Sequence, residues 1–597
     1  MEVNECSVQY SIDLSNRRAH LYIVTMTMDG AWPKQRLSLP VWTPGSYMVR
    51  DFAQHIVEIK AFERKSPIEI EKTNKNTFLV HNSGPSIFIV YHVYAFDSSI
   101  RSAFIDDTQA FFNGTALFLR PHDRENARYV VNLKKPGDKN GSSHEVATTM
   151  PILDVDDMGF GSYEARSYQE LVDYPVQISA MTRLPFEVGR IPHEMTLVGD
   201  VRPFDETRLQ NDLGKLCEQH LKLFGKTTPF QRYLFIGRFE EGGHGGLEHR
   251  NSSMLLASPY SLPKPGLCEP DSNYRNFLSL CSHEYFHAWN VKHLKPYNFS
   301  SYDFDHECYT TMLWIFEGLT SYYDDLLVRR AGLMSVASYL ELLGKNYNRL
   351  LRTKGRQKQS LAESSFDAWI KFYRPNENSA NAGVSYYLKG SFIGLYLDLS
   401  IRSRSGHKMS LDDVMRVAAE RFGGEKGITE EQFFDLLAEV GVLDTQLIKE
   451  RYIYGVDEIP LKELLSEFGI DLSLVADECF LDDKTRMSAF LGFKLRFDDN
   501  DRALISFVEN NSAATASGLS PGDEVVAVND IRIDSSNCGD VFGRMRAEPQ
   551  LFTFARKKLI RHCEIVPTAV PMQNCKWALS SMISSQQKSA LERWLGK

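Results

Sequence analysis

The sequence predicts a multidomain protein in which a β-sandwich is followed by an α+β part, a helical part and a smaller sheet-rich module. Three observations support this prediction. The chain has 597 residues, which is enough for three or four domains with separate cores. Runs of β-branched and aromatic residues fill the chain to about residue 165. From residue 173 onward the pattern is mixed, and it then becomes strongly helical to about residue 475.

Three segments near the amino end have the composition of β-strands. Residues 20–28, 77–80 and 86–93 are rich in β-branched and aromatic side chains, and turn residues bound each segment. Sheets built from such strands bury one face against another sheet. We therefore expect a β-sandwich over residues 1–165.

A helix is predicted in the middle of the chain. Residues 273–280 contain no Pro or Gly and carry apolar side chains at helical spacing. The helix runs on into His283-Glu284-Tyr285-Phe286-His287, where two histidines four residues apart point the same way and can share one metal ion. Glu284 would face the same cavity and could take a proton from a water on a zinc ion. This pattern predicts a hydrolase.

Zinc needs a third protein ligand, and two glutamates downstream are candidates. Glu317 lies in residues 310–320, an apolar segment that is typical of a second buried helix. Because a buried carboxylate without a partner is unfavourable, Glu317 should lie on a cation. Glu307 lies in the polar stretch 302–307 and is better explained as the solvated start of that helix. We predict that His283, His287 and Glu317 bind one Zn²⁺ per chain.

Several motifs resemble one family. The pattern His-Glu-x-x-His followed by Trp-x-x-Glu-Gly-Leu-Thr resembles the gluzincin metallopeptidases, in which a glutamate of the next long helix completes the site. Residues 39–52, 112–115 and 242–249 are similar to the PDZ-bearing glycyl aminopeptidase family, and the resemblance extends from about residue 5 to about residue 560. It implies a thermolysin-like α+β catalytic domain at residues 166–340 and a helical subdomain at residues 341–482.

Residues 513–530 are similar to the central signature of PDZ domains, and a strand is predicted to open at residues 490–493. The segment Pro521-Gly522-Asp523 would form the turn before the next strand. We expect a PDZ domain at residues 483–562 and a carboxyl-terminal tail at residues 563–597. Such a domain captures an extended peptide by strand addition, with the peptide carboxylate near Gly492 and Phe493. The alternative is a degenerate module packed against the catalytic domain.

The family resemblance also suggests a second group that stabilises the reaction. Peptide hydrolysis develops negative charge on the carbonyl oxygen, and zinc supplies only part of its stabilisation. Residues 384–390 resemble the place where gluzincin aminopeptidases carry a tyrosine hydroxyl for this purpose. Tyr387 matches their Tyr-x-Lys-Gly spacing better than Tyr386 does. The competing interpretation is that both tyrosines belong to the core.

An aminopeptidase must bind a free amino terminus, which is a cation in a partly desolvated cleft, and a carboxylate has to meet it. Glu248 fits this role, because Gly245 and Gly246 allow the substrate backbone to approach closely. Aminopeptidase relatives use a Gly-x-Met-Glu segment similarly, and Leu247 replaces the methionine with little change in volume. A phosphate-binding loop is disfavoured because no Lys-Ser/Thr pair follows the glycines.

Composition excludes several other functions. The 68 Lys and Arg against 77 Asp and Glu give a net charge of -9, and no basic stripe favours nucleic-acid binding. The first residues lack the basic and apolar regions of a secretory signal, and no stretch is long enough to cross a bilayer. The nine cysteines are scattered, so a reducing cytoplasm is expected.

Together these patterns predict a zinc-dependent aminopeptidase that acts on peptides with a free amino terminus. A preference for glycine or alanine is implied by the family resemblance alone. One alternative is a zinc endopeptidase, which an N-acetylated substrate would distinguish. The other is a peptide-binding protein whose PDZ domain matters more than a vestigial zinc site.

Overall fold

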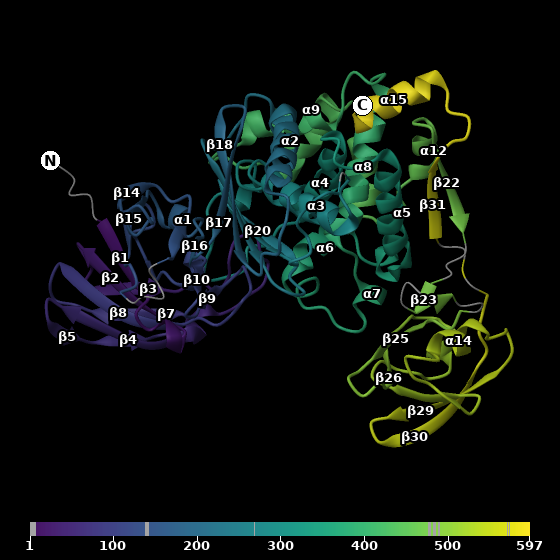
Figure 1. Cartoon of the computed structure of the whole chain (residues 1–597), viewed down its shortest axis with the longest axis horizontal. Coiled ribbons are helices and arrows are strands. Elements are labelled where there is room, and N and C mark those ends of the chain that lie inside the picture. Colours follow the sequence, from purple (N-terminus) through teal and green to yellow (C-terminus); the bar gives the residue numbers. More distant parts are fainter. Residues whose placement is uncertain are drawn as a thin grey trace. The chain divides into compact units, whose positions relative to one another are not determined.

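The computed structural model describes residues 7–137, 143–267, 269–475, 479–481, 485–486, 490–569, 571 and 574–596 (Figure 1). The chain forms two compact units. The first spans Met1–Ser335 and Arg404–Leu443 and includes Lys597, and the second spans Val336–Ser403 and Asp444–Gly596. The predicted boundary between residues 482 and 483 lies outside the described residues, as do residues 1–6.

The amino-terminal part of the first unit is built from three β-sheets around one hydrophobic core. The largest sheet has, in spatial order, β14 (Ile152–Val155), β15 (Gly161–Ala165), β12 (Arg128–Leu133), β1 (Ser7–Asp13), β2 (Leu21–Asp29), β8 (Ser86–Tyr94), β4 (Ile56–Glu63) and β5 (Ser66–Ile68). A second sheet has β11 (Arg120–Pro121), β3 (Lys34–Ser38), β7 (Thr77–His81) and β6 (Ile70–Lys72). The third has β13 (Glu145–Ala147), β16 (Val176–Ser179), β10 (Gln109–Phe112) and β9 (Ala103–Ile105).

The alternation of side chains explains why these strands form a sandwich. Along β2 and β8, every second side chain is buried, which is expected for strands that bury one face. The core takes side chains from all three sheets, including Tyr10, Val80 and Phe112. The predicted sandwich is confirmed, and its three predicted strands are present as β2, β7 and β8. Its third sheet also uses β16, so the sheet-rich part continues past residue 165, with the helix α1 (Tyr168–Leu171) before β16.

A five-stranded sheet and three helices follow in the first unit (Figure 1). The sheet has, in order, β17 (Thr182–Val188), β18 (Ile191–Gly199), β19 (Tyr233–Phe239), β21 (Ser252–Ala257) and β20 (Gly245–Glu248). The three inner strands are parallel, and every residue of the central strand β19 is buried. The helices are α2 (Glu206–Phe224), α3 (Ser272–Phe286) and α4 (Leu319–Arg330). Because α3 contacts both β20 and β21, the edge strand β20 lies beside the helix that carries the two histidines.

Two further helices complete the first unit. They are α9 (Leu411–Phe422) and α10 (Glu430–Glu439). Trp314 packs against Phe433 and Phe434 of α10, and Arg330 at the end of α4 forms a 2.8 Å ion pair with Asp412 of α9. These contacts attach Trp314, just before α4, to α10 and the end of α4 to α9.

In the described residues, the second unit combines helices with three sheets, two of which have only two strands. Its helices outside the PDZ domain are α5 (Val336–Arg352), α6 (Leu361–Phe366), α7 (Ser379–Ala382), α8 (Tyr386–Arg404), α11 (Thr445–Ile448), α12 (Leu461–Ser466) and α15 (Ser585–Leu595). Strand β22 (Ile470–Val475) pairs with β31 (Asn574–Leu579). Trp577 of β31 packs on Tyr347, and Trp594 of α15 packs on Tyr339, both on α5. Strand β31 and helix α15 therefore pack against α5.

The PDZ domain also lies in the second unit. Its sheet has β25 (Phe493–Phe497), β26 (Ala503–Val508), β27 (Glu524–Val528), β29 (Gln550–Arg556) and β30 (Leu559–Ile565), with β28 (Ile531–Arg532) paired to β27. Two helices, α13 (Ala513–Ala516) and α14 (Cys538–Gly543), complete it. The turn at Gly522, which has a φ of +87°, precedes β27 as predicted. Strand β23 (Cys479–Leu481) contacts β25, and β24 (Thr485–Arg486) contacts α14.

Two helical predictions need correction. Residues 310–312 are not helical, because the segment that carries Glu317 begins as the π-helical turn η6 (Trp314–Gly318) and continues directly into α4. Residues 470–475 are not helical either, since they form β22, whose partner strand lies about a hundred residues further along the chain. In the part of the chain that the structure describes, no helix is both long and apolar enough to span a membrane.

Candidate active site

Helix α3 delivers the two histidines. Asp271 caps its first turn by accepting a hydrogen bond from the backbone N–H of Tyr274 at 2.9 Å. His283 lies in the last turn, and His287 follows the last helical residue while its N–H still bonds to the carbonyl oxygen of His283. The two imidazole rings lie with their centroids 4.7 Å apart. The spacing of the motif therefore places both rings on one side of the helix.

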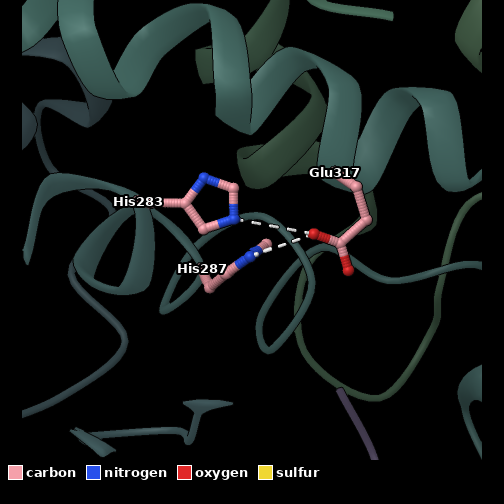
Figure 2. Close-up of side chains that lie close together, drawn as sticks. All are labelled: His283, His287 and Glu317. Carbon is pink, nitrogen blue, oxygen red and sulfur yellow. Dashed lines mark ion pairs between the residues drawn. The ribbon is translucent and has the colours of Figure 1, made fainter. Parts of the chain in front are cut away.

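Glu317 of η6 meets both imidazoles (Figure 2). Its Oε2 lies 3.7 Å from Nε2 of His283 and 3.3 Å from Nε2 of His287. Ligand atoms about 2.1 Å from one tetrahedral zinc ion lie roughly 3.4 Å apart, which is close to these distances. The two nitrogens and one oxygen also form the donor set that zinc prefers. The three residues thus fit a zinc ion.

A second layer of contacts orients the ligands. Nδ1 of His283 lies 3.0 Å from Oδ2 of Asp324, and Nδ1 of His287 lies 2.7 Å from the carbonyl oxygen of Asn290. These contacts leave each Nε2 turned toward Glu317. The Asn290 amide in turn donates hydrogen bonds to the carbonyl oxygens of Ile315 and Phe316 at 3.0 and 3.3 Å, which ties the loop after α3 to η6.

The amino-terminal domain contributes to the same centre. The hydroxyl of Tyr47 donates a hydrogen bond to Oε1 of Glu317 at 3.3 Å, across 270 residues of sequence. Tyr47 belongs to the segment 39–52 that carries part of the family resemblance, but no pattern in the sequence indicated this contact. The sequence likewise gave no signal for Asn290. Asp324 could have been found, since it lies about two helical turns after Glu317 on the same face.

Glu284 is buried next to the metal ligands. Its side chain is 4% exposed, and its Oε2 has no hydrogen-bond partner among the described residues. Burial raises the pKa of the Glu284 carboxyl above its ordinary value, against the opposing effect of His283 and His287. A carboxylate in such surroundings can take up a proton, which is what a general base must do.

Gly246 of β20 is packed against Glu284. A Cβ atom at this position would lie 1.9 Å from Oε1 of Glu284, so only glycine leaves room for the Glu284 carboxylate. Gly245, with a φ of +144°, adopts backbone geometry that other residues avoid. Gly246 therefore packs against Glu284, a role that was not predicted from the sequence, which indicated only a contact of Gly246 with substrate.

Glu248, at the end of β20, is brought to the same cluster. It is 3% exposed, and one carboxylate oxygen of each of Glu248 and Glu284 lies within 4.8 Å of the other and of a ring nitrogen of His287. Its Oε1 is buried with no hydrogen-bond partner in the described part of the chain. The turn at Gly45 covers its other side, since a Cβ there would lie 2.5 Å from Oε2 of Glu248.

Lys292 is a buried cation that interacts electrostatically with Glu248. Lys292 and Arg250 form ion pairs of 2.9 and 3.2 Å with Asp173, and the three residues line a pocket with His249. Burial lowers the pKa of Lys292, but Asp173 and then Glu248 outweigh it and hold that pKa above its ordinary value. The Lys292 ammonium therefore contributes positive potential at Glu248.

Tyr386 and Tyr387 begin helix α8 of the second unit, whereas the metal ligands belong to the first. Tyr386 is fully buried and Tyr387 is partly exposed. Both rings pack on Phe372, with centroids 4.9 and 5.4 Å away. The assignment of Tyr387 as the oxyanion donor stays a prediction.

Comparison with known families gives three matches along the chain. The model of the Peptidase M61 N-terminal domain matches residues 9–180, that of the M61 glycyl aminopeptidase matches residues 276–393, and that of the PDZ domain matches residues 481–541. These matches confirm the predicted arrangement of a sheet-rich amino-terminal domain, a peptidase region and a PDZ domain. No curated protein matches the chain.

Solved structures are also similar. An aminopeptidase N family protein from Idiomarina loihiensis is 33% identical with a TM-score of 0.93, over 99% of this chain and 100% of that chain. An M1 zinc metallopeptidase from Deinococcus radiodurans is 11% identical with a TM-score of 0.47, over 76% of this chain and 95% of that one. Yeast LTA4 hydrolase in complex with bestatin is 13% identical with a TM-score of 0.46, over 76% of this chain and 68% of that one.

Proposed function

Because the chain belongs to the M61 glycyl aminopeptidase family, we propose that it is a zinc-dependent enzyme that removes amino-terminal glycine or alanine from peptides. One observation carries this proposal: His283, His287 and Glu317 converge next to two buried carboxylates, Glu284 and Glu248. The first three would hold one zinc ion per chain. The other two would perform the chemistry and bind the amino terminus.

A zinc ion held there would act as a Lewis acid toward the scissile carbonyl and lower the pKa of a nearby water. Glu284 would take the proton of the attacking water and pass it to the leaving amine. Its burial suits this task, because a carboxylate whose pKa is raised both accepts and returns a proton readily. The zinc ligands would be kept in position during the reaction by their contacts with Tyr47, Asp324 and Asn290.

Glu248 would bind the substrate ammonium. A buried carboxylate with an unpartnered oxygen offers a strong charge-assisted hydrogen bond to such a cation. Its closeness to Glu284 leaves room for one residue between the ammonium and the scissile bond. The turn at Gly45 closes the space beyond Glu248, which supports removal of single amino-terminal residues over internal cleavage.

Tyr387 would donate its hydroxyl to the developing oxyanion. Tyr387→Phe should then lower kcat about 100-fold while zinc content stays normal, because one oxyanion hydrogen bond is lost. Tyr386→Phe is the matched control, with the same atom removed from the neighbouring ring. Normal turnover of Tyr387→Phe together with a crippled Tyr386→Phe would assign the role to Tyr386.

The PDZ domain would bind the carboxyl terminus of a peptide along β25, the edge strand of its sheet. Strands β23 and β24 contact β25 and α14, so a ligand would share this surface with them. We place the protein in the cytoplasm, since six cysteines of the described residues are free thiols, four of them buried.

The test of the proposed function combines metal analysis with a peptide panel. The purified protein should contain one zinc per chain, lose activity on chelation and regain it on addition of zinc. It should cleave peptides with free amino-terminal Gly or Ala and leave their N-acetylated forms intact. Glu284→Gln should retain zinc while turnover falls about 100-fold or more. Equal cleavage of free and acetylated peptides would instead identify an endopeptidase.

A further inference from the structure

Arg101, a residue of the amino-terminal domain, contacts β20, the strand that carries Gly245, Gly246 and Glu248. It lies in the turn before β9, and its Nη2 donates a hydrogen bond to the carbonyl oxygen of Gly246 at 2.9 Å. Its guanidinium also lies against Gly245, where a Cβ would be 3.7 Å from Nη1. The backbone of Arg101 is held in place, because its carbonyl oxygen accepts a hydrogen bond from the Thr43 hydroxyl at 3.3 Å.

The charge of Arg101 has no acidic partner. Within the described ranges no carboxylate forms an ion pair with it, and its buried Nε has no hydrogen-bond partner. A guanidinium has five N–H donors in a planar fork that matches a carboxylate, and the Gly246 carbonyl takes only one of them. A partly buried cation of this kind is suited to bind an anionic group of a ligand.

The spacing along β20 indicates which group that is. Gly246 precedes Glu248 by two residues of extended strand, a distance of about 6.6 Å. An extended dipeptide spans roughly the same length from its amino nitrogen to its carboxylate. β20 is the edge strand of its sheet, so a peptide can lie along it. With the ammonium on Glu248, the carboxylate of a dipeptide arrives beside Arg101.

We propose that Arg101 binds the free carboxylate of the substrate, so that the enzyme selects dipeptides. The cleft would thus match both ends of a zwitterion, with Glu248 for the ammonium and Arg101 for the carboxylate. This inference rests on the proposed function, because it takes Glu248 as the group that binds the amino terminus.

The experiment measures kcat/KM for the dipeptides Ala-Ala and Gly-Ala and for the same peptides with a carboxyl-terminal amide. Wild type should cleave the free acids about 10 to 100 times more efficiently than the amides, the range expected for hydrogen bonds to a charged group. Arg101→Gln should lose that factor on the acids and keep the wild-type rate on the amides. Arg101→Lys should recover part of it, since lysine keeps the charge without the fork.

Arg124→Gln is the matched control. Arg124 is a partly buried arginine of the same domain that likewise donates to a backbone carbonyl, that of Gly30. It should leave the preference for acids over amides unchanged. Equal kcat/KM of wild type on acids and amides would overturn the inference, and so would an Arg101→Gln variant that slows both equally, because Arg101 would then only fasten the domain to β20. Failure to cleave any peptide with a free amino terminus, amides included, would reject the proposed function itself.

Discussion

The candidate metal centre and the strand β20, which we propose to contact substrate, are assembled over different distances in the sequence. The ligands and the partners of their ring nitrogens lie between His283 and Asp324, on α3, η6 and α4 and the loop between them. The strand β20, by contrast, is flanked by Gly45 and by Arg101, which is 145 residues away from Gly246. The first region is built mainly by the packing of neighbouring helices, to which Tyr47 adds a contact from the amino-terminal domain, whereas the second needs two domains to meet.

This difference separates chemistry from recognition. A residue of the metal centre acts on every substrate, because zinc is needed for each turnover. Under the proposed function, a residue beside β20 binds an end of the peptide, so its removal should change which peptides are cleaved. Substitutions in the two regions should therefore produce two kinds of kinetic defect.

The largest effect is expected for Glu317→Ala. Two imidazoles alone do not make a stable zinc site, so the variant should purify with little metal and show no activity on any peptide. Zinc content by mass spectrometry and a peptide panel measure this. Glu307→Ala removes the rival carboxylate and serves as control. Full zinc in Glu317→Ala, with loss of zinc in Glu307→Ala, would reassign the ligand.

The next largest effect is expected for Gly246→Ala. Gly246 lies on β20 and packs against Glu284, so the substitution affects both regions. The added methyl group would overlap the Glu284 carboxylate, which must move away from its position as the base. We expect kcat to fall about 100-fold, as for loss of general-base catalysis, with zinc retained. Leu247→Met, a volume-conserving change on the same strand, should leave kcat near the wild-type value. A wild-type kcat in Gly246→Ala would contradict the close packing of Glu284 on β20.

The convergence of the three candidate zinc ligands could be predicted from the sequence because its signals are local. The spacing of His283 and His287 and an apolar helix around Glu317 are visible without any knowledge of the fold. The contacts of Tyr47 and Arg101 could not be predicted, since they join segments 270 and 145 residues apart. Such contacts depend on how two domains dock, which no helical or strand period encodes.

The same reasoning explains what was predicted of the fold. Strands β2, β7 and β8 are rich in β-branched and aromatic residues and are bounded by turn residues, and the PDZ turn at Gly522 shows the residues that it requires. The strand β22 was missed because its partner β31 lies near the end of the chain. The π-helical turn η6 was missed because helical spacing does not distinguish it from an α-helix.

Glu248→Ala tests whether β20 recognises the amino terminus of the substrate. Loss of this carboxylate leaves the substrate ammonium desolvated and unpaired, at a cost of about 3 kcal/mol, or a hundredfold in kcat/KM. The loss should be confined to peptides with a free amino terminus, and zinc content should stay normal. Steady-state kinetics on paired free and N-acetylated Gly-peptides measure it. An equal loss on both peptides would mean that Glu248 serves the chemistry itself.

The smallest effect is expected for Asp324→Asn, although this residue lies in the metal centre. An asparagine can still accept a hydrogen bond from Nδ1 of His283, but it lacks the negative charge that strengthens the histidine as a ligand. Zinc affinity should fall about 10-fold, and excess zinc should restore wild-type turnover. Competition with a chelator measures the affinity, and Asp325→Asn removes the adjacent carboxylate, which binds Ser279 and not a ligand histidine, as a control. Suppose that excess zinc fails to restore the turnover of Asp324→Asn. The Asp324 carboxylate then acts on the reaction as well as on the metal. In that case the separation between the two regions is less sharp than their sequence distances indicate.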